Sequence, residues 1–344
     1  MDLSVIDVSA LVHTAEHVDI YRERSYYGYP VGGIHFLMRQ ICTKVLLAND
    51  FVLCFDSPTF RKGLLSKYKS GREHSPAVIS QLESLYEGLS SCGIRCEKFD
   101  GYEADDVVDW AVQQNLKDYS EILIVGNDYD LCHSVQSKVR FTTINRGMNN
   151  IFRGNFEHSI EKGRHVLFNT ISAYKVMCGC HSDKIPAMKL ANGMGGYRLY
   201  CAFVDWAKGS GIPLTYANTT DPRFLMLFAK NSGLFDDGDV EELLNRIKLV
   251  YPAACPDGVK IVPNSYYGLD KDKLCQFLTI YNDYDSIKCL GGKKAFLSEE
   301  AKQMLRDKGR SLTTGEFAAD KNIEQRAGVS DTLMRLDAFS KEFV

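Results

Sequence analysis

Short apolar runs that end in acidic residues recur along the first 130 residues of the chain. Residues 3–7 form the first run, residues 51–56 the second and residues 122–128 the third. Continuous apolar runs of this kind are typical of strands buried on both faces of a parallel sheet. Residues 31–48 lie between two of them and have the apolar spacing of a helix. The alternation predicts an α/β fold with a mostly parallel central sheet flanked by helices.

Helical patterns dominate the second half of the chain. Residues 139–144 are predicted as an edge strand or hairpin arm, and residues 210–221 as a loop. The predicted helices cover residues 168–177, 196–207, 222–232, 240–250, 269–287 and 298–308. We therefore predict three regions, which are an α/β core over 1–165, a helical region over 166–290 and a helical extension over 291–344.

Composition indicates a soluble protein of a reducing compartment. The 344 residues are 45% hydrophobic and 25% charged, and no apolar run has the length of a membrane span. The N-terminus has no basic region that would indicate a signal peptide. The 11 cysteines form no CxxC pair, and several, such as Cys54 and Cys201, lie in apolar runs, which predicts buried thiols in a cytoplasm.

The stretch Gly101–Val112 begins with a dense group of acids. Glu103, Asp105 and Asp106 fall in the first turn of a predicted helix, where acids are favoured by the helix dipole. Helix capping is one explanation, and neutralisation of the cluster by a divalent cation is the other. Asp7, Asp56, Asp128 and Asp130 end the predicted strands. Because the carboxyl ends of parallel strands meet at one edge, these acids favour a shared metal site.

A basic segment separates the second strand from the acidic helix. Its bases are Arg61, Lys62, Lys67, Lys69 and Arg72, with Phe60 and Tyr68 interleaved and no acid among them. Bases with aromatics suit a phosphate backbone and a stacked nucleobase, although a solvated basic loop is equally compatible. The net charge of −3 excludes a generally basic nucleic-acid binder but not a localised basic patch. A glycine-rich turn over 192–198 opens a helix, as phosphate sites and ordinary packing turns both do.

The order of these motifs resembles the 5′-nuclease superfamily, and most closely its bacteriophage members. The resemblance is carried by Ile6–His13, by Phe55-Asp56 with Thr59–Arg72, by Tyr102–Val107, by Val125–Leu131 and by Ser182–Pro186. It implies a PIN-like fold with a helical arch over about 59–92 and a helix–turn–helix in the C-terminal helical region. The implied activity is that of a structure-specific 5′–3′ exonuclease or flap endonuclease that hydrolyses DNA and removes RNA primers during replication or repair.

Residue roles follow from the same resemblance. It implies two magnesium or manganese ions, one held around Asp7, Asp56, Glu103, Asp105 and Asp106, and the other by Asp128, Asp130 and Asp183. Catalytic Lys69 and Arg72 would face the scissile phosphate. Implied DNA-binding residues are Arg61, Lys62, Lys67, Tyr68, Lys69, Arg72, Gly193, Gly195, Gly196 and Arg198, with potassium at the glycine turn. The implied substrates are a 5′ flap, a nick, a single-stranded 5′ end or an RNA–DNA hybrid, bound by a monomer.

Two departures from the family pattern affect this expectation. Cys180 stands where the family has the first acid of an acid-x-x-acid pair, and a thiol is a poor ligand for magnesium. The second metal should therefore bind more weakly. Residues 187–191 also lengthen the segment before the glycine turn, and Arg198 is the nearest base after it. Duplex binding is therefore expected to differ from that of the family.

Other functions remain open on the sequence alone. Cys180 motivates a catalytically weak protein that binds DNA junctions. Asp128-Tyr-Asp130 matches the DxD of nucleotide-sugar transferases, but this leaves the acidic helix start unexplained. Cys178, Cys180 and His181 offer ligands for zinc. The tail over 331–344 is either a helix docked on the body or a peptide for a sliding clamp or single-strand binding protein.

Overall fold

The computed structural model describes residues 2–42, 50–71, 75–143, 151–153, 157–161, 164–255, 270–290 and 299–314. The chain divides into two compact units, unit 1 with residues 1–10, 48–73 and 94–268, and unit 2 with residues 11–47, 74–93 and 269–344. The linear boundaries near residues 165 and 290 stay predictions. Arg72 and the tail over 331–344 lie outside the described residues.

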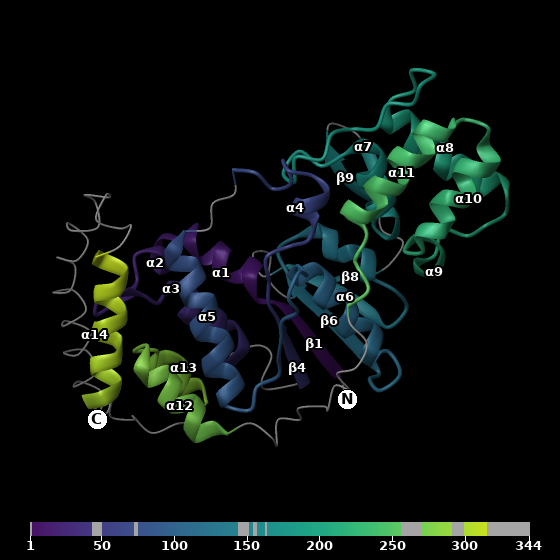
Figure 1. The fold of residues 1–344 in the computed structure, drawn as a ribbon. Helices are drawn as coiled ribbons and strands as arrows, with labels where there is room; N and C mark the ends of the chain where they lie inside the picture. Colours follow the sequence, from purple (N-terminus) through teal and green to yellow (C-terminus); the bar gives the residue numbers. More distant parts are fainter. Residues whose placement is uncertain are drawn as a thin grey trace. The chain divides into compact units, whose positions relative to one another are not determined.

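Unit 1 contains a six-stranded sheet and a group of helices (Figure 1). Its strands are β1 (Asp2–Asp7), β4 (Asp50–Cys54), β5 (Cys96–Glu97), β6 (Glu121–Gly126), β7 (Val139–Thr143), β8 (Ile151–Arg153), β9 (Glu157–Glu161) and β10 (Arg164–Leu167). Its helices are α4 (Arg61–Leu64), α6 (Ala104–Asn115), η2 (Tyr129–Ser134), η4 (Phe168–Thr170), α7 (Ile171–Cys178), α8 (Gly196–Gly209), α9 (Tyr216–Thr219), α10 (Pro222–Ser232) and α11 (Asp237–Val250).

The sheet confirms the predicted fold class. Its order is β5-β4-β1-β6-β7-β8, and every neighbouring pair is parallel except β7 with β8. The central strands are apolar along their length because both faces are covered, and α6 packs against β1 and β4. Residues 139–144 are predicted as an edge strand or a hairpin arm. The hairpin arm is confirmed, because β7 pairs antiparallel with β8, whereas the edge position is wrong, because β7 also pairs with β6.

A separate apolar core joins the helices of unit 1 from residue 166 to residue 251. Phe203 and Phe228, at its centre, are fully buried. The predicted helix over 222–232 is confirmed, while the region predicted as loop over 210–221 contains the short helix α9. The sequence did not indicate the β9–β10 hairpin. Helices α7 and α8 contact each other across the segment 179–195, and their role as a helix–turn–helix stays a prediction.

Unit 2 is mainly helical and contains most of α1 (Val8–Glu16). Its other elements are α2 (Asp19–Arg22), β2 (Ser25–Tyr26), β3 (Tyr29–Pro30), α3 (Gly32–Gln40), α5 (Pro76–Ser91), α12 (Lys271–Ile280), α13 (Tyr284–Cys289) and α14 (Glu299–Thr314). The single helix predicted over 269–287 is wrong. Asn282 adopts a φ of 59°, and Asp283 caps a new helix by accepting from the Ser286 N–H, so α12 and α13 are separate.

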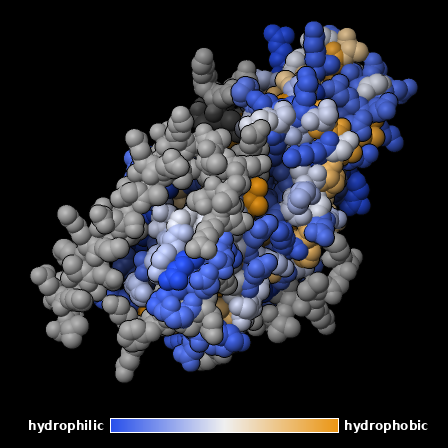
Figure 2. All heavy atoms as spheres, turned by 60° about the vertical axis from the view of Figure 1, so that its left-hand side comes forward, coloured by the Kyte–Doolittle hydropathy of each residue, from blue (hydrophilic) through white to orange (hydrophobic). Residues whose placement is uncertain are grey.

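The 11 cysteines are all free thiols. Cys54 is buried in β4 as predicted, but Cys201 is exposed because it lies on the outer face of α8. None of the helices in the described ranges has the length and apolar character needed to cross a membrane. Figure 2 shows a face on which hydrophilic residues predominate and hydrophobic residues occupy small areas.

Gly196 permits the close packing of α8 on α7, which gives a first prediction. A Cβ at Gly196 would lie 2.1 Å from the carbonyl oxygen of Met177, whereas a Cβ at Gly195 would meet nothing within 4 Å. We expect Gly196→Ala to lower the free energy of unfolding by about 1–3 kcal/mol, measured by urea denaturation. Gly195→Ala is the matched control and should change it by less than about 0.5 kcal/mol. Equal losses in both variants would contradict this packing role.

Candidate functional site

Three strand ends place carboxylates side by side at one edge of the sheet. β1 lies between β4 and β6 and is parallel to both, so Asp7, Asp56 and Asp128 follow adjacent carboxyl ends. Backbone donors orient each one. Asp7 Oδ1 accepts from the Ala10 N–H at 3.0 Å, Asp56 Oδ1 accepts from the Ala104 N–H at 2.7 Å, and Asp128 Oδ1 accepts from the Asp130 N–H at 3.0 Å. The predicted convergence of these acids is therefore confirmed.

The acidic start of α6 forms a capping box. Glu103 is the N-cap residue, and Asp106 accepts from the Glu103 N–H at 3.0 Å. Both side chains are buried. Capping thus explains two of the three acids, as the simpler sequence interpretation held. Asp105 is the third, and its carboxylate belongs to a different group.

Arg61 neutralises the capping pair from the opposite side. Its Nη1 and Nη2 donate to the two oxygens of Asp106 at 2.6 and 2.7 Å, and Nη1 also donates to Glu103 at 3.0 Å. Nε donates to the Leu249 carbonyl at 2.9 Å, and Nη2 donates to the Tyr251 carbonyl at 3.0 Å. All five N–H donors of the buried guanidinium therefore have acceptors. One side chain ties α4 and α6 to the end of α11.

Tyr68 and Lys69 complete the surroundings of Glu103. The Tyr68 hydroxyl donates to one carboxylate oxygen at 2.9 Å and the Lys69 ammonium donates to the other at 2.5 Å. Burial lowers the pKa of Lys69, but the charge of Glu103 and of the neighbouring acidic groups raises it by a larger amount. The net pKa of Lys69 is therefore raised. Lys69 therefore carries its charge beside Glu103 and has a positive φ of 48°.

Asp105, Asp128 and Asp130 form an open group of ligands. They offer one oxygen each, and the three oxygens all lie within 4.8 Å of one another. Burial, and then the charge of Asp128, raise the pKa of Asp105 to about 7 from 3.8. Burial, followed by Asp105 and Asp56, also raises the pKa of Asp7. Uncompensated repulsion is thus concentrated here and not at the Arg61 side of the site.

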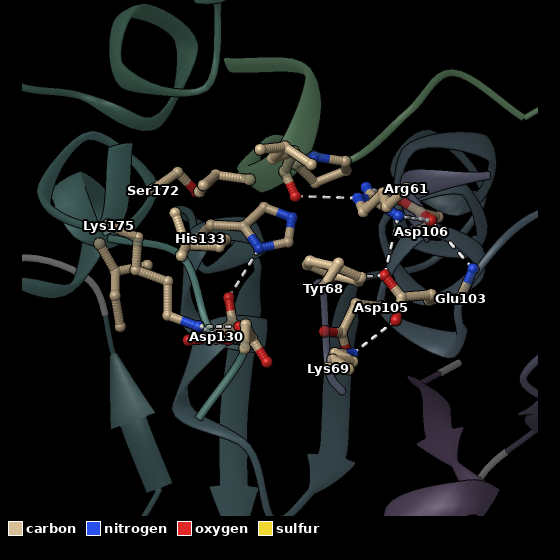
Figure 3. A pocket seen from close by; sticks show the side chains of 16 residues that line it. Arg61, Tyr68, Lys69, Glu103, Asp105, Asp106, Asp130, His133, Ser172 and Lys175 are labelled. Carbon is tan, nitrogen blue, oxygen red and sulfur yellow. Dashed lines mark hydrogen bonds and ion pairs between the residues drawn. The ribbon is translucent and has the colours of Figure 1, made fainter. Parts of the chain in front are cut away.

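Lys175 and His133 face the other side of Asp130. The Lys175 ammonium donates to Asp130 and lies 3.4 Å from Asp183. Burial lowers the pKa of Lys175, but the charges of Asp128 and Asp183 more than offset this effect, so the net pKa is raised. The His133 Nδ1 pairs with the Asp130 carbonyl oxygen at 2.7 Å. Figure 3 shows the resulting pocket, with Lys175 and Asp130 on one wall and the Arg61 group on the other.

The donor set suits a hard divalent cation. Carboxylate oxygens are the preferred ligands of magnesium, manganese and calcium, and zinc favours nitrogen and sulfur. Within the described part of the chain, Asp105, Asp128 and Asp130 form the only group of three or more potential metal-binding side chains close enough to share an ion. Cys178, Cys180 and His181 do not form such a group, so the zinc interpretation gains no support.

The chain also matches known proteins over its α/β part. A family model described as 5′-3′ exonuclease, N-terminal resolvase-like domain matches residues 2–161. The matched segment is a little under half of the chain, so residues 2–161 are similar to this family. The 5′-3′ exonuclease of Bacillus subtilis (strain 168) is 26% identical over 177 residues, which cover 50% of this chain and 59% of that protein. The 5′-3′ exonuclease of Buchnera aphidicola (strain APS) is 30% identical over 135 residues, covering 35% and 47%.

The aligned part of the chain thus spans about half the length of these relatives. Among solved structures, the T5 D15 protein co-crystallised with metal ions is similar over 91% of this chain and 99% of that chain. Its sequence identity is 13% and its TM-score is 0.47, values at which the likeness supports no statement about ligands or activity.

The segment that matches this family model brings most of the predicted site residues together, although their roles stay predictions. The open group of Asp105, Asp128 and Asp130 has two further acids beside it, because Asp7 interacts electrostatically with Asp56, Asp105 and Asp128. Glu103 and Asp106 are bound by cationic side chains of the protein itself. Asp183 lies across Lys175 from Asp130.

The predicted DNA-binding residues divide into buried and exposed groups. Arg61 and Tyr68 are 3% and 4% exposed, so the expectation that they meet nucleic acid at the surface is not met in this structure. Their polar atoms bind the acidic helix start instead. The exposed bases of this segment are Lys62 and Lys67. In the glycine turn, Gly193 and Gly195 are exposed and Gly196 is buried.

Lys175 is a site residue that sequence reasoning missed. It lies in an otherwise apolar helical stretch, so its periodicity indicated only a helix. The available signal was a lysine on a helix that leads directly into Cys180 and Asp183. His133, from η2, also lines the pocket.

Arg61 should be essential for folding. Arg61→Met removes the cationic partner of the buried Asp106, one cationic partner of Glu103 and the donor to two carbonyls at the end of α11. We expect a loss of about 3–5 kcal/mol in the free energy of unfolding. Arg223→Met is the matched control, because Arg223 binds Asp221 while its side chain is 89% exposed. The control should cost less than about 1 kcal/mol. A wild-type unfolding midpoint for Arg61→Met in urea would show that the network is dispensable.

Asp105 should make the metal-free protein, prepared in EDTA, less stable at higher pH. Its pKa is about 7 in the folded state against 3.8 ordinarily, so the folded state binds the proton more tightly. Its contribution is therefore fully present below about pH 4 and lost as pH rises through about 7. In EDTA at about pH 8, Asp105→Asn should be more stable than wild type by about 1–4 kcal/mol, and the difference should shrink toward pH 5.

Thermal and urea unfolding across this pH range would measure the effect. Asp205→Asn makes the same change at an exposed position of α8 and should leave the stability profile unaltered. A destabilised Asp105→Asn variant at high pH would contradict the predicted repulsion.

Proposed function

We propose that this chain is a metal-dependent 5′ nuclease that hydrolyses phosphodiester bonds at 5′ flaps, nicks or single-stranded 5′ ends of DNA. The observation that carries the proposal is the convergence of Asp105, Asp128 and Asp130 with Asp7 and Asp56 at one sheet edge. The cluster lies in the segment that a 5′-3′ exonuclease family model matches, and two similar proteins bear that name, which supports the proposal. RNA in RNA–DNA hybrids is a further substrate of the same chemistry.

Magnesium or manganese is the cofactor that the oxygen donors favour. Such an ion lowers the pKa of a bound water and offsets charge on the attacked phosphate. Asp105, Asp128 and Asp130 would hold it, while Asp7 and Asp56 would add negative charge beside it. Asp128 is exposed, so this edge is accessible from solvent, and Lys62 and Lys67 are exposed bases of the segment that also carries Lys69.

Lys69 is the protein group best placed to offset charge on the substrate phosphate. Its ammonium lines the pocket beside Asp105 and is held by Glu103, which fixes its direction. Preorganised cations of this kind stabilise developing negative charge without reorganisation during the reaction. Arg72, Arg198 and the turn at Gly193 and Gly195 stay predictions as further DNA contacts, as does potassium at that turn. A cytoplasmic location, a monomeric state and a clamp or single-strand binding protein as partner also stay predictions.

Cleavage of a 5′-labelled flap in magnesium tests the proposal. Wild-type protein should cut the flap, and Asp128→Ala combined with Asp130→Ala should reduce the rate at least about 100-fold, because both changes remove direct cation ligands. Asp205→Ala, at an exposed site on α8, should cut at the wild-type rate. Wild-type protein that binds the flap but never cuts it in magnesium or manganese would support a junction-binding protein in place of a nuclease.

A further inference from the structure

Lys175 occupies the space between two carboxylates of the site. It projects from α7, and its ammonium donates to Asp130 Oδ2 and lies 3.4 Å from Asp183 Oδ2. The side chains of Lys175 and Asp183 are 17% and 10% exposed, so this ion pair is largely shielded from water. Ion pairs in such surroundings are screened much less than surface pairs. A cationic group of the protein therefore already lies where Asp130 and Asp183 would hold an ion.

The Cys180 thiol is a poor substitute for the carboxylate oxygens that Lys175 occupies. The Cys180 thiol lies 3.0 Å from the Ser182 hydroxyl, and the Cys180 backbone is paired with Ile185 in both directions. A thiol is a soft ligand, while magnesium and manganese favour oxygen. A magnesium or manganese ion on this side of the site would therefore depend on Asp130 and Asp183, and both contact Lys175.

We propose that the chain binds one divalent cation, at Asp105, Asp128 and Asp130, and that the Lys175 ammonium supplies the second positive charge, beside Asp183. The inference rests on the proposed nuclease function and specifies its metal content. A second divalent ion at Asp130 and Asp183 would have to displace Lys175 or be repelled by it. Asp130 serves both cations, since a carboxylate has two oxygens and Lys175 is bound to Oδ2.

Counting bound ions in the full-length protein tests the inference without any substitution. Manganese added to metal-free protein can be followed by the electron paramagnetic resonance signal of the free ion, with equilibrium dialysis as a second count. We expect one ion per chain, with no second ion until manganese exceeds the first dissociation constant by about 100-fold, or 2.7 kcal/mol. Two ions of similar affinity would overturn the inference and leave the nuclease function standing. No bound ion would overturn both.

Two variants separate the lysine from the cysteine as the cause. Cys180→Asp alone should still bind one ion, because Lys175 remains in place. Cys180→Asp combined with Lys175→Met should bind two, since a carboxylate is added and the competing ammonium is removed. Two ions in Cys180→Asp alone, or one ion in a folded double variant, would overturn the role of Lys175.

Lys208→Met in the Cys180→Asp background is the matched control, since Lys208 is exposed on α8. It should bind one ion. Circular dichroism and thermal unfolding establish that each variant is folded, and if the double variant does not fold, the counts for wild type and Cys180→Asp decide the question.

Discussion

Repulsion among carboxylates at one edge of a parallel sheet is the constraint on which this site depends. β1 pairs with β4 and β6, so the acids that follow these strands cannot avoid one another. Backbone N–H groups at helix starts hold Asp7, Asp56 and Asp128 in place and offset part of their charge. The remainder shows in the raised pKa values of Asp7 and Asp105. The same repulsion that would favour a cation at this edge therefore destabilises the fold when no cation is bound.

Cationic side chains of the protein divide the acids into a sealed part and an open part. Arg61 and Lys69 pair with Glu103 and Asp106, which lie in the same helix start as Asp105 yet point into a different environment. Because Arg61 also binds the carbonyls of Leu249 and Tyr251, the end of α11 helps to set the position of α6. The guanidinium of Arg61 and the ammonium of Lys175 thereby both connect the helical part of unit 1 to the acidic edge.

Much of this arrangement could be predicted from the sequence because it depends on the spacing of apolar residues and on the order of the motifs along the chain. Apolar runs ending in acids indicated parallel strands and their shared edge, and the structure has both. What could not be predicted is how each acid is used. Glu103, Asp105 and Asp106 are adjacent in sequence, and only the contacts of Arg61 and Tyr68 show that two of them are neutralised within the protein. Lys175 was missed because a single lysine in an apolar helix carries no pattern.

The basic segment shows that the sequence also cannot tell which bases are buried and which are exposed. Arg61 and Lys62 are neighbours in a basic run, yet Arg61 faces the protein interior and Lys62 faces solvent. A one-residue step around a helical turn is enough to reverse the side chain's environment. The charge of a segment therefore does not show what its side chains bind or whether they face the protein interior or solvent. At this site, the same kind of residue serves as internal counterion on one face and remains available to a polyanion on the other.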